Sequence, residues 1–205
     1  MKSELRNRLT EGAAAVGVHL SPAQAEQLLA LADLLLDWNT RVNLTAIRDL
    51  RGVVDRHLVD SLAVVPHLVP GSLVDVGAGA GFPGLPIALV RPDVSVTLLE
   101  SIHKKSAFTR SVILTLAIPA TACTARLEDW ARDAPRQANA VSRATFAPLE
   151  WLRRGAPLLG PGGVLMAMTT PAEPDPLPPG GSTFERHHYS LPDGTPRVLW
   201  RLRFT

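Results

Sequence analysis

In the first seventy residues, apolar positions recur every three or four residues, which is the spacing of one face of an α-helix. The recurring residues form three groups: Leu5, Leu9, Ala13 and Val16; Leu28, Leu31, Leu35, Trp38 and Val42; Leu50, Val54, Leu58, Leu62 and Val65. Gly17 ends the first predicted helix, Ser21 and Gln24 have the spacing of a capping box for the second, and Pro66 closes the third. The pattern predicts a helical extension over residues 1–70.

After residue 70 the period changes, and short β-branched runs alternate with helical stretches. The runs are SLVDV, VSVTLLE, TACTA, NAVS and GGVLMAM. This alternation predicts parallel strands joined by crossover helices, an α/β domain with a doubly wound, Rossmann-like sheet over residues 71–205. The segments STFERHHYS and PRVLWRLRFT, joined by LPDGT, predict an antiparallel hairpin at one edge of the sheet. The proline-rich segment 171–182 predicts a surface loop.

Composition narrows the class of protein. A chain of 205 residues with 46% hydrophobic content suits one substantial domain with a small appendage. No apolar run approaches the roughly 18 residues of a membrane span, and the first residues carry no export signal. The single cysteine, Cys123, cannot form an internal disulfide, which favours the reducing cytoplasm. We therefore expect a cytoplasmic protein without membrane contact.

A glycine-rich turn follows the first predicted strand. Gly77, Gly79 and Gly81 lie between SLVDV and a helical stretch, where glycine permits a tight turn and a close backbone approach to a ligand. Asp75 precedes the turn, and Glu100 ends the next strand, where it can accept both hydroxyls of a ribose. A carboxylate beside a helix N-terminus disfavours a pyrophosphate but tolerates a cationic cofactor. The order of residues favours S-adenosylmethionine, with a nicotinamide enzyme as the alternative.

Other candidate ligand contacts lie at the carboxyl ends of later strands, where open α/β sheets bind ligands. The third strand leads into Leu127 and Glu128, which can flank an adenine ring, and the fourth ends at Arg143, beside the expected methyl donor. Phe82 follows the glycine turn and can pack on the cofactor. Helix capping for Glu128 and core packing for Phe82 stay open as alternatives.

Basic residues cluster in two stretches, which suits phosphate contacts although the net charge is only +2. They are Arg41, Arg48, Arg51 and Arg56, then His103, Lys104, Lys105 and Arg110. Arg56 and Asp60 have the spacing of an ion pair on a helix. His187 and His188 point to opposite sides of one strand and cannot share a metal, so we predict no metal site.

The sequence resembles the bacterial small-subunit ribosomal RNA guanine-N7 methyltransferases, historically called glucose-inhibited division protein B. The matching segments keep the family's order: WNTRVNLTAIRD, RHLVDS, LVDVGAGAGFPGLPIALVRP, LLESIHKKSAF, ARLED and VSRA. The resemblance implies a class I methyltransferase fold, S-adenosylmethionine as cofactor, and ribosomal RNA or the small ribosomal subunit as partner. We expect a monomer that methylates RNA during ribosomal RNA processing.

The resemblance also implies roles for individual residues. With the glycine turn, the expected cofactor contacts are Asp75, Gly77, Gly79, Phe82, Glu100, Leu127, Glu128 and Arg143. The candidate catalytic residues are Arg143, His57 and Asn39. Arg48 and Arg56 are candidate RNA contacts, to which the basic cluster adds Lys104 and Lys105. One departure concerns Thr169 and Thr170, which stand where the family usually has Lys-Gly.

Guanine N7 carries an in-plane lone pair, so methylation there requires no catalytic base. The enzyme then has to align N7, the methyl carbon and sulfur, which is a proximity effect. Two alternatives stay open. The departure at Thr169 fits a paralogue with another substrate, such as a small molecule, and a protein that binds cofactor or RNA without turnover would share the same motifs.

Overall fold

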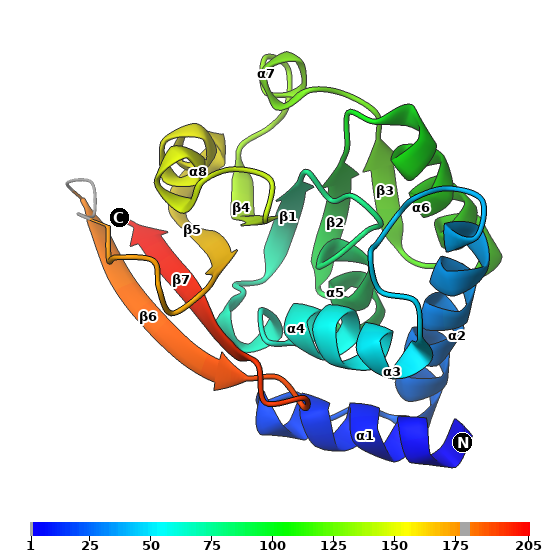
Figure 1. Cartoon of the computed structure of the whole chain (residues 1–205). Helices are drawn as coiled ribbons and strands as arrows, with labels where there is room; N and C mark the ends of the chain where they lie inside the picture. The colour runs from blue at the N-terminus through cyan, green and yellow to red at the C-terminus, as the bar shows by residue number, and fades with distance from the viewer. Residues whose placement is uncertain (1, 177–180) are drawn as a thin grey trace.

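The computed structural model describes residues 2–176 and 181–205, and within these ranges it has a central seven-stranded sheet with helices on both faces (Figure 1). The strand order is β3-β2-β1-β4-β5-β7-β6. The strands are β1 (Gly71–Val76), β2 (Val94–Leu99), β3 (Ala120–Cys123), β4 (Gln137–Arg143), β5 (Leu159–Thr169), β6 (Ser182–Ser190) and β7 (Pro196–Phe204). The first five pair in parallel, and β7 is antiparallel to β5 and β6. This confirms the predicted α/β sheet and its edge hairpin.

The side chains of β1 alternate between two hydrophobic clusters, one on each face of the sheet. Leu73 packs on the face of α2, α5 and α6, whereas Val74 and Val76 pack on the face of α8 with Trp151. The helices after β1 are α5 (Gly84–Val90), α6 (His103–Thr115), α7 (Leu127–Trp130), α8 (Pro148–Gly155) and the short 3₁₀ helix η3 (Ala156–Leu158). Burial on both faces is what a parallel sheet requires.

The first seventy residues are helical, as the apolar spacing predicts. They form α1 (Lys2–Ala15), α2 (Pro22–Asn39), α3 (Leu50–Val53), the π-helical turn η1 (Val54–Val59), α4 (Asp60–Leu62) and the 3₁₀ turn η2 (Val65–His67). Ser21 and Gln24 form the capping box of α2, with both reciprocal hydrogen bonds present. These helices share one hydrophobic cluster with the sheet, and a domain boundary at residue 70 remains a prediction.

The π-helical turn corrects one expectation about the third helix. Its i→i+5 pattern changes which residues share a face, so the spacing of Arg56 and Asp60 no longer makes them neighbours. Instead Arg56 pairs with Asp193, 2.7 Å away in the turn between β6 and β7, and Asp60 pairs with Arg143 at 3.0 Å. The turn therefore directs Asp60 towards the end of β4.

The C-terminal hairpin runs along β5 and reaches α1 at its turn (Figure 1). A Cβ on Gly12 of α1 would lie 2.9 Å from Pro192, so helix and turn approach closely. Of the proline-rich segment, residues 177–180 lie outside the described residues, and the part before them has no helix or strand. Arg186 of β6 donates to the Pro171 carbonyl at 2.9 Å. In the described chain, no helix is long and apolar enough to cross a membrane.

Candidate active site

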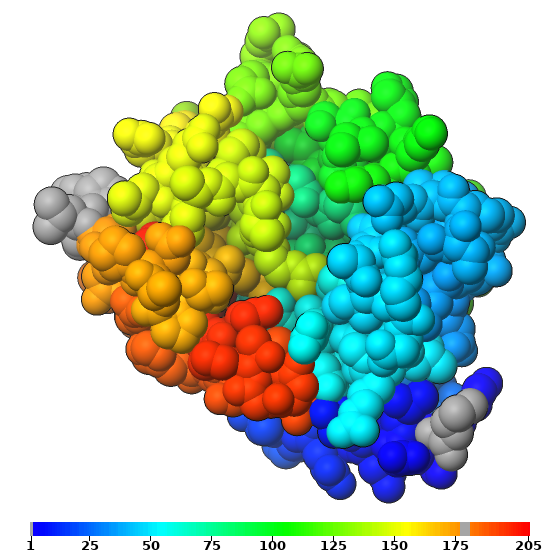
Figure 2. All heavy atoms as spheres, in the orientation of Figure 1, coloured from blue at the N-terminus to red at the C-terminus, as the bar shows by residue number. Residues whose placement is uncertain are grey.

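A cleft of about 500 Å³ lies at the carboxyl ends of β1 and β4. Figure 2 shows it as a hollow between the cyan segment near residues 40–60 and the yellow-green segment after β4. A second cleft, of about 290 Å³, begins on the other side of Gly77 and Thr145, which line both. We call the first the acceptor cleft and the second the adenosine cleft. A further cavity of about 530 Å³ lies between α7 and η3, away from most predicted site residues.

The glycine turn forms the wall between the two clefts. Gly77 has φ +72° and Gly79 has φ +58°, a left-handed region that favours glycine. A Cβ on Gly77 would lie 2.7 Å from the Cβ of Thr145, whose hydroxyl donates to the Gly77 carbonyl. A Cβ on Gly79 would meet only the Gly77 carbonyl oxygen, at 3.9 Å. Gly79 therefore leaves room for a ligand against the turn, whereas the space at Gly77 is filled by Thr145.

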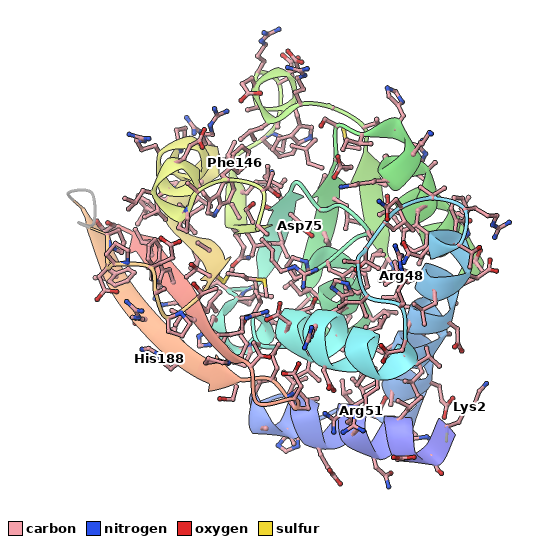
Figure 3. The ribbon with its side chains drawn as sticks, viewed as in Figure 1. Lys2, Arg48, Arg51, Asp75, Phe146 and His188 are labelled. Carbon is pink, nitrogen blue, oxygen red and sulfur yellow. The ribbon has the colours of Figure 1, made fainter. Side chains whose placement is uncertain are left out.

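Asp75 lies beneath this turn, in the middle of the sheet (Figure 3). Its side chain is fully buried, and Oδ2 accepts a hydrogen bond of 2.8 Å from the Gly84 amide at the start of α5. Burial raises the pKa of Asp75 to about 7, which the Gly84 hydrogen bond and Arg143 partly oppose. Asp75 lines neither cleft. In the structure Asp75 fixes β1 to α5, and its expected direct cofactor contact stays a prediction.

Glu100 holds the turn from the neighbouring strand. Its Oε2 accepts from the Gly79 amide at 2.8 Å, and its Oε1 accepts from the Ile102 amide at 2.7 Å. Only 6% of the residue is exposed. Glu100 lines neither cleft, but each carboxylate oxygen has a second lone pair for a ribose hydroxyl, and this expected bond stays a prediction.

Leu127 and Glu128 line the adenosine cleft, at the start of α7. Glu128 forms an ion pair with Arg154 of α8, which also binds Glu150 at 2.8 Å. The Arg154 guanidinium lies 5.2 Å from the ring centre of Phe146. Phe146 and Thr145 line this cleft but carry no sequence signal, because they belong to an irregular segment after β4.

Arg143 connects the sheet to the N-terminal helices. Its guanidinium donates to Asp60 Oδ2 at 3.0 Å, to the Arg56 carbonyl at 3.1 Å and to His57 Nδ1 at 3.0 Å. It also lies 5.8 Å from the ring centre of Phe82. Arg143, His57 and Phe82 line the acceptor cleft together, as expected for a shared site.

His57 is held as a neutral imidazole. Burial, with the charge of Arg143, lowers its pKa to about 3, and its ring stacks on Phe82 with centres 4.8 Å apart. Because a guanidinium only donates, Nδ1 must accept and Nε2 carries the proton. Nε2 lies 2.8 Å from the hydroxyl of Thr45, to which it donates.

Asn39 does not line the acceptor cleft, and its expected catalytic role stays a prediction. Its amide nitrogen donates to the carbonyls of Thr45 and Ile47, and its oxygen accepts from the amides of Leu44 and Thr45. These bonds fold residues 40–47 into a fixed loop. Asn39 thereby positions Thr45, the partner of His57.

The basic residues divide into two sets. Arg56 and Lys105 line the acceptor cleft, whereas Lys104 is exposed outside it. Arg48 lies on the loop beside the cleft, where it donates to the Thr45 carbonyl and to Asn43 (Figure 3).

The acceptor cleft also contains residues from the end of β5 and from β7. Thr169, Thr170 and Arg197 line it, and Val198, next to Arg197, pairs with Thr169 across the strands. The sequence pattern did not indicate Arg197, because only the strand pairing brings it to this position. Within the described residues, no group of three or more histidine, cysteine or acidic side chains could hold a metal.

The sheet with its inverted β7, the glycine turn after β1 and the acid at the end of β2 define a class I, Rossmann-like methyltransferase. Solved structures with this fold include TrmN from Thermus thermophilus, with a TM-score of 0.57 and 18% identity over 86% of this chain and 52% of that chain. Another is the precorrin-6y C5,15-methyltransferase from Geobacter metallireducens, with a TM-score of 0.53 and 13% identity over 79% and 90% of the two chains. At these identities the likeness shows the fold alone.

The sequence comparisons define the family. The model for "rRNA small subunit methyltransferase G" matches residues 24–175. The chain is 41% identical to the ribosomal RNA small subunit methyltransferase G of Leptothrix cholodnii, over 95% of this chain and 94% of that protein. It is 40% identical to the protein of that name from Chromohalobacter salexigens, over 96% of each. The chain belongs to this family and is a methyltransferase, which confirms the resemblance.

Proposed function

We propose that this enzyme transfers a methyl group from S-adenosylmethionine to N7 of a guanine in small-subunit ribosomal RNA. The proposal rests on one observation: Arg143 contacts a neutral His57 in the cleft that borders the glycine turn. The relatives that share about 40% of the residues bear the name of a small-subunit ribosomal RNA methyltransferase, which supports this class of substrate.

The residues around the turn fit the cofactor. Gly79 leaves space where a Cβ would stand, Gly77 lets the chain pass close to Thr145, and Glu100 offers free lone pairs beside the turn. The adenosine cleft would take the base between Leu127 and Phe146. S-adenosylmethionine supplies an electrophilic methyl group when bound.

The acceptor cleft has the properties that attack by N7 requires. A neutral purine nitrogen presents its lone pair without losing a proton, so no base is needed. His57 is neutral, its Nδ1 accepts from Arg143 and its Nε2 donates to Thr45, so it orients groups and does not act as a base. Arg143 would orient acceptor oxygens, and Phe82 offers an aromatic face beside it.

Cationic groups around the acceptor cleft suit an RNA backbone. Arg56, Lys105 and Arg197 line it, and Arg48 lies on the adjacent loop. Arg197 supplies a cation beside Thr169, where the family usually has lysine. A ribosomal substrate would place the enzyme in the cytoplasm.

The proposal is tested on ribosomal RNA from a deletion strain. Mass spectrometry should show one 7-methylguanosine missing from small-subunit RNA, restored by the wild-type gene and not by Arg143→Ala. Arg153→Ala, which removes an exposed arginine of α8, is the matched control and should restore it. Unchanged 7-methylguanosine in the deletion strain would overturn the proposal. Methyl transfer to metabolites and not to isolated subunits would favour the small-molecule alternative.

A further inference from the structure

Asp60 is a buried carboxylate with partners from three distant parts of the chain. Its Oδ2 binds the Arg143 guanidinium at 3.0 Å, and its Oδ1 accepts from the Tyr189 hydroxyl at 2.8 Å. Arg197 Nε lies 3.8 Å from the same Oδ1. Only 4% of the Asp60 side chain is exposed. A buried carboxylate needs such partners, and they fix its orientation.

The hairpin presents two of these partners together. Tyr189 of β6 and Arg197 of β7 are direct cross-strand partners, so their side chains lie on the same face. That face is turned towards Asp60 at the start of α4. The hairpin therefore reaches Arg143 through one carboxylate, although Tyr189 itself does not line the acceptor cleft.

We propose that Tyr189 is a positioning residue for the methyl-transfer reaction, which holds Arg143 in place through Asp60. The inference rests on the proposed role of Arg143 in the acceptor cleft. The Tyr189 hydroxyl can donate only one proton, and Asp60 Oδ1 receives it. This fixes the rotation of the carboxylate and so directs Oδ2 at the guanidinium. The phenol is partly buried, and burial together with Asp60 raises the pKa of Tyr189, so it stays protonated.

The first test removes the hydroxyl alone. Tyr189→Phe should lower kcat on isolated small subunits about tenfold, since misplacement of a reacting group by about 1 Å can cost up to about 10²-fold. The affinity for S-adenosylhomocysteine should stay within about threefold, because the cofactor turn is untouched. Thr183→Val, which removes an exposed hydroxyl from the same strand, is the matched control and should leave kcat unchanged. Wild-type kcat in Tyr189→Phe would overturn the inference.

A second test separates positioning from a general effect of the hydroxyl. In single-turnover reactions, Tyr189→Phe should cause no further loss when Arg143 is already alanine, because the two changes act on one contact chain. An equal loss in both backgrounds would overturn the inference. Wild-type activity on subunits in the same assay shows that the proposed function stands even if the inference fails.

A third test needs no change at Tyr189. The chain contains one tyrosine, so ¹³Cζ-tyrosine labelling gives a single resonance that reports the hydrogen bond to Asp60. Arg143→Ala should shift this resonance, because Asp60 loses its guanidinium partner and reorients. Arg153→Ala should leave it in place. An unshifted resonance in folded Arg143→Ala would overturn the inference. This test keeps Tyr189 itself, so it holds even if Tyr189→Phe fails to fold.

Discussion

Nδ1 of His57 lies 3.0 Å from a guanidinium nitrogen of Arg143, and both side chains also lie against the ring of Phe82. A proton on Nδ1 would face a fixed positive charge, which is one reason why the pKa of His57 falls to about 3, after burial. Protonation of His57 would therefore disrupt its contact with Arg143. We expect its protonation to couple to unfolding and not to catalysis.

The free energy of unfolding should respond to acid through His57. Its folded pKa of about 3 lies below the value of about 6.5 in the unfolded chain, so the unfolded state binds more protons between these limits. Stability from this residue is present above about pH 6.5 and is lost as pH falls, by up to about 1.4 kcal/mol per pH unit. The pKa of Asp75 is raised to about 7, so its contribution to stability increases as pH falls. The contribution of His57 must therefore be measured as the difference between wild type and a His57 variant.

Urea unfolding of wild type and His57→Gln between pH 4 and 6.5 measures that difference. The stability of the variant should improve relative to wild type as pH falls. His19→Gln, which changes an exposed histidine, should track wild type at every pH. A pH-independent difference between wild type and His57→Gln would contradict the prediction.

Gly77→Ala should destabilise the fold and weaken cofactor binding. The new Cβ combines a positive φ with a clash against Thr145, and overpacking of this kind costs about 1–3 kcal/mol. Gly194→Ala is the matched control, since Gly194 has φ +84° but nothing within 4 Å of its Cβ position. Calorimetry with S-adenosylhomocysteine should show lost affinity for Gly77→Ala only. Thr145→Gly in the same chain should recover part of it.

Asn39→Ala should loosen the loop that supports His57. Its four side-chain hydrogen bonds would be lost, and the partners left unsatisfied cost about 1–3 kcal/mol of unfolding free energy. Hydrogen exchange at the amides of Leu44 and Thr45 should accelerate before the protein unfolds globally. Asn7→Ala, on the exposed face of α1, should change neither. If these amides remained protected from exchange in the folded Asn39→Ala variant, the Asn39 side chain would not be what holds the loop in place.

Lys105→Gln should weaken RNA binding in a salt-dependent way. A lysine that neutralises one phosphate contributes about one unit to the slope of log affinity against log salt. Titrations with small-subunit RNA at several salt concentrations should therefore give a shallower slope. Lys2→Gln, at the exposed start of α1, should keep the wild-type slope (Figure 3). The same slope in both variants would remove Lys105 from the RNA contacts.

The local parts of the fold could be predicted from the sequence. Ser21 and Gln24 specify the start of α2 through a four-residue pattern, and the short apolar run SLVDV followed by glycine indicates the strand before Gly77. The π-helical turn Val54–Val59 could not be predicted, because such turns depend on packing around them. The sequence therefore shows that a helix exists there but not which residues share its faces.

The candidate site, like the fold, could be predicted only in part. Glu100 and Arg143 could be placed because each ends a predicted strand. Asp60 binds partners 83 and 129 residues further along the chain, and no local pattern specifies such contacts. Asn39 resembles a site residue in sequence, yet its hydrogen bonds lie within residues 39–47, and only the folded loop shows this.

The strand order has a consequence for synthesis of the protein. In the described sheet β6 pairs with β7 and not with β5, although the ribosome makes β6 first. β6 therefore has no partner in this sheet until β7 has been made and has paired with β5. Arg197 reaches the acceptor cleft, and Tyr189 reaches Asp60, only once this hairpin is in place, so the acceptor cleft is completed by the last strand of the chain, whereas the glycine turn belongs to the first.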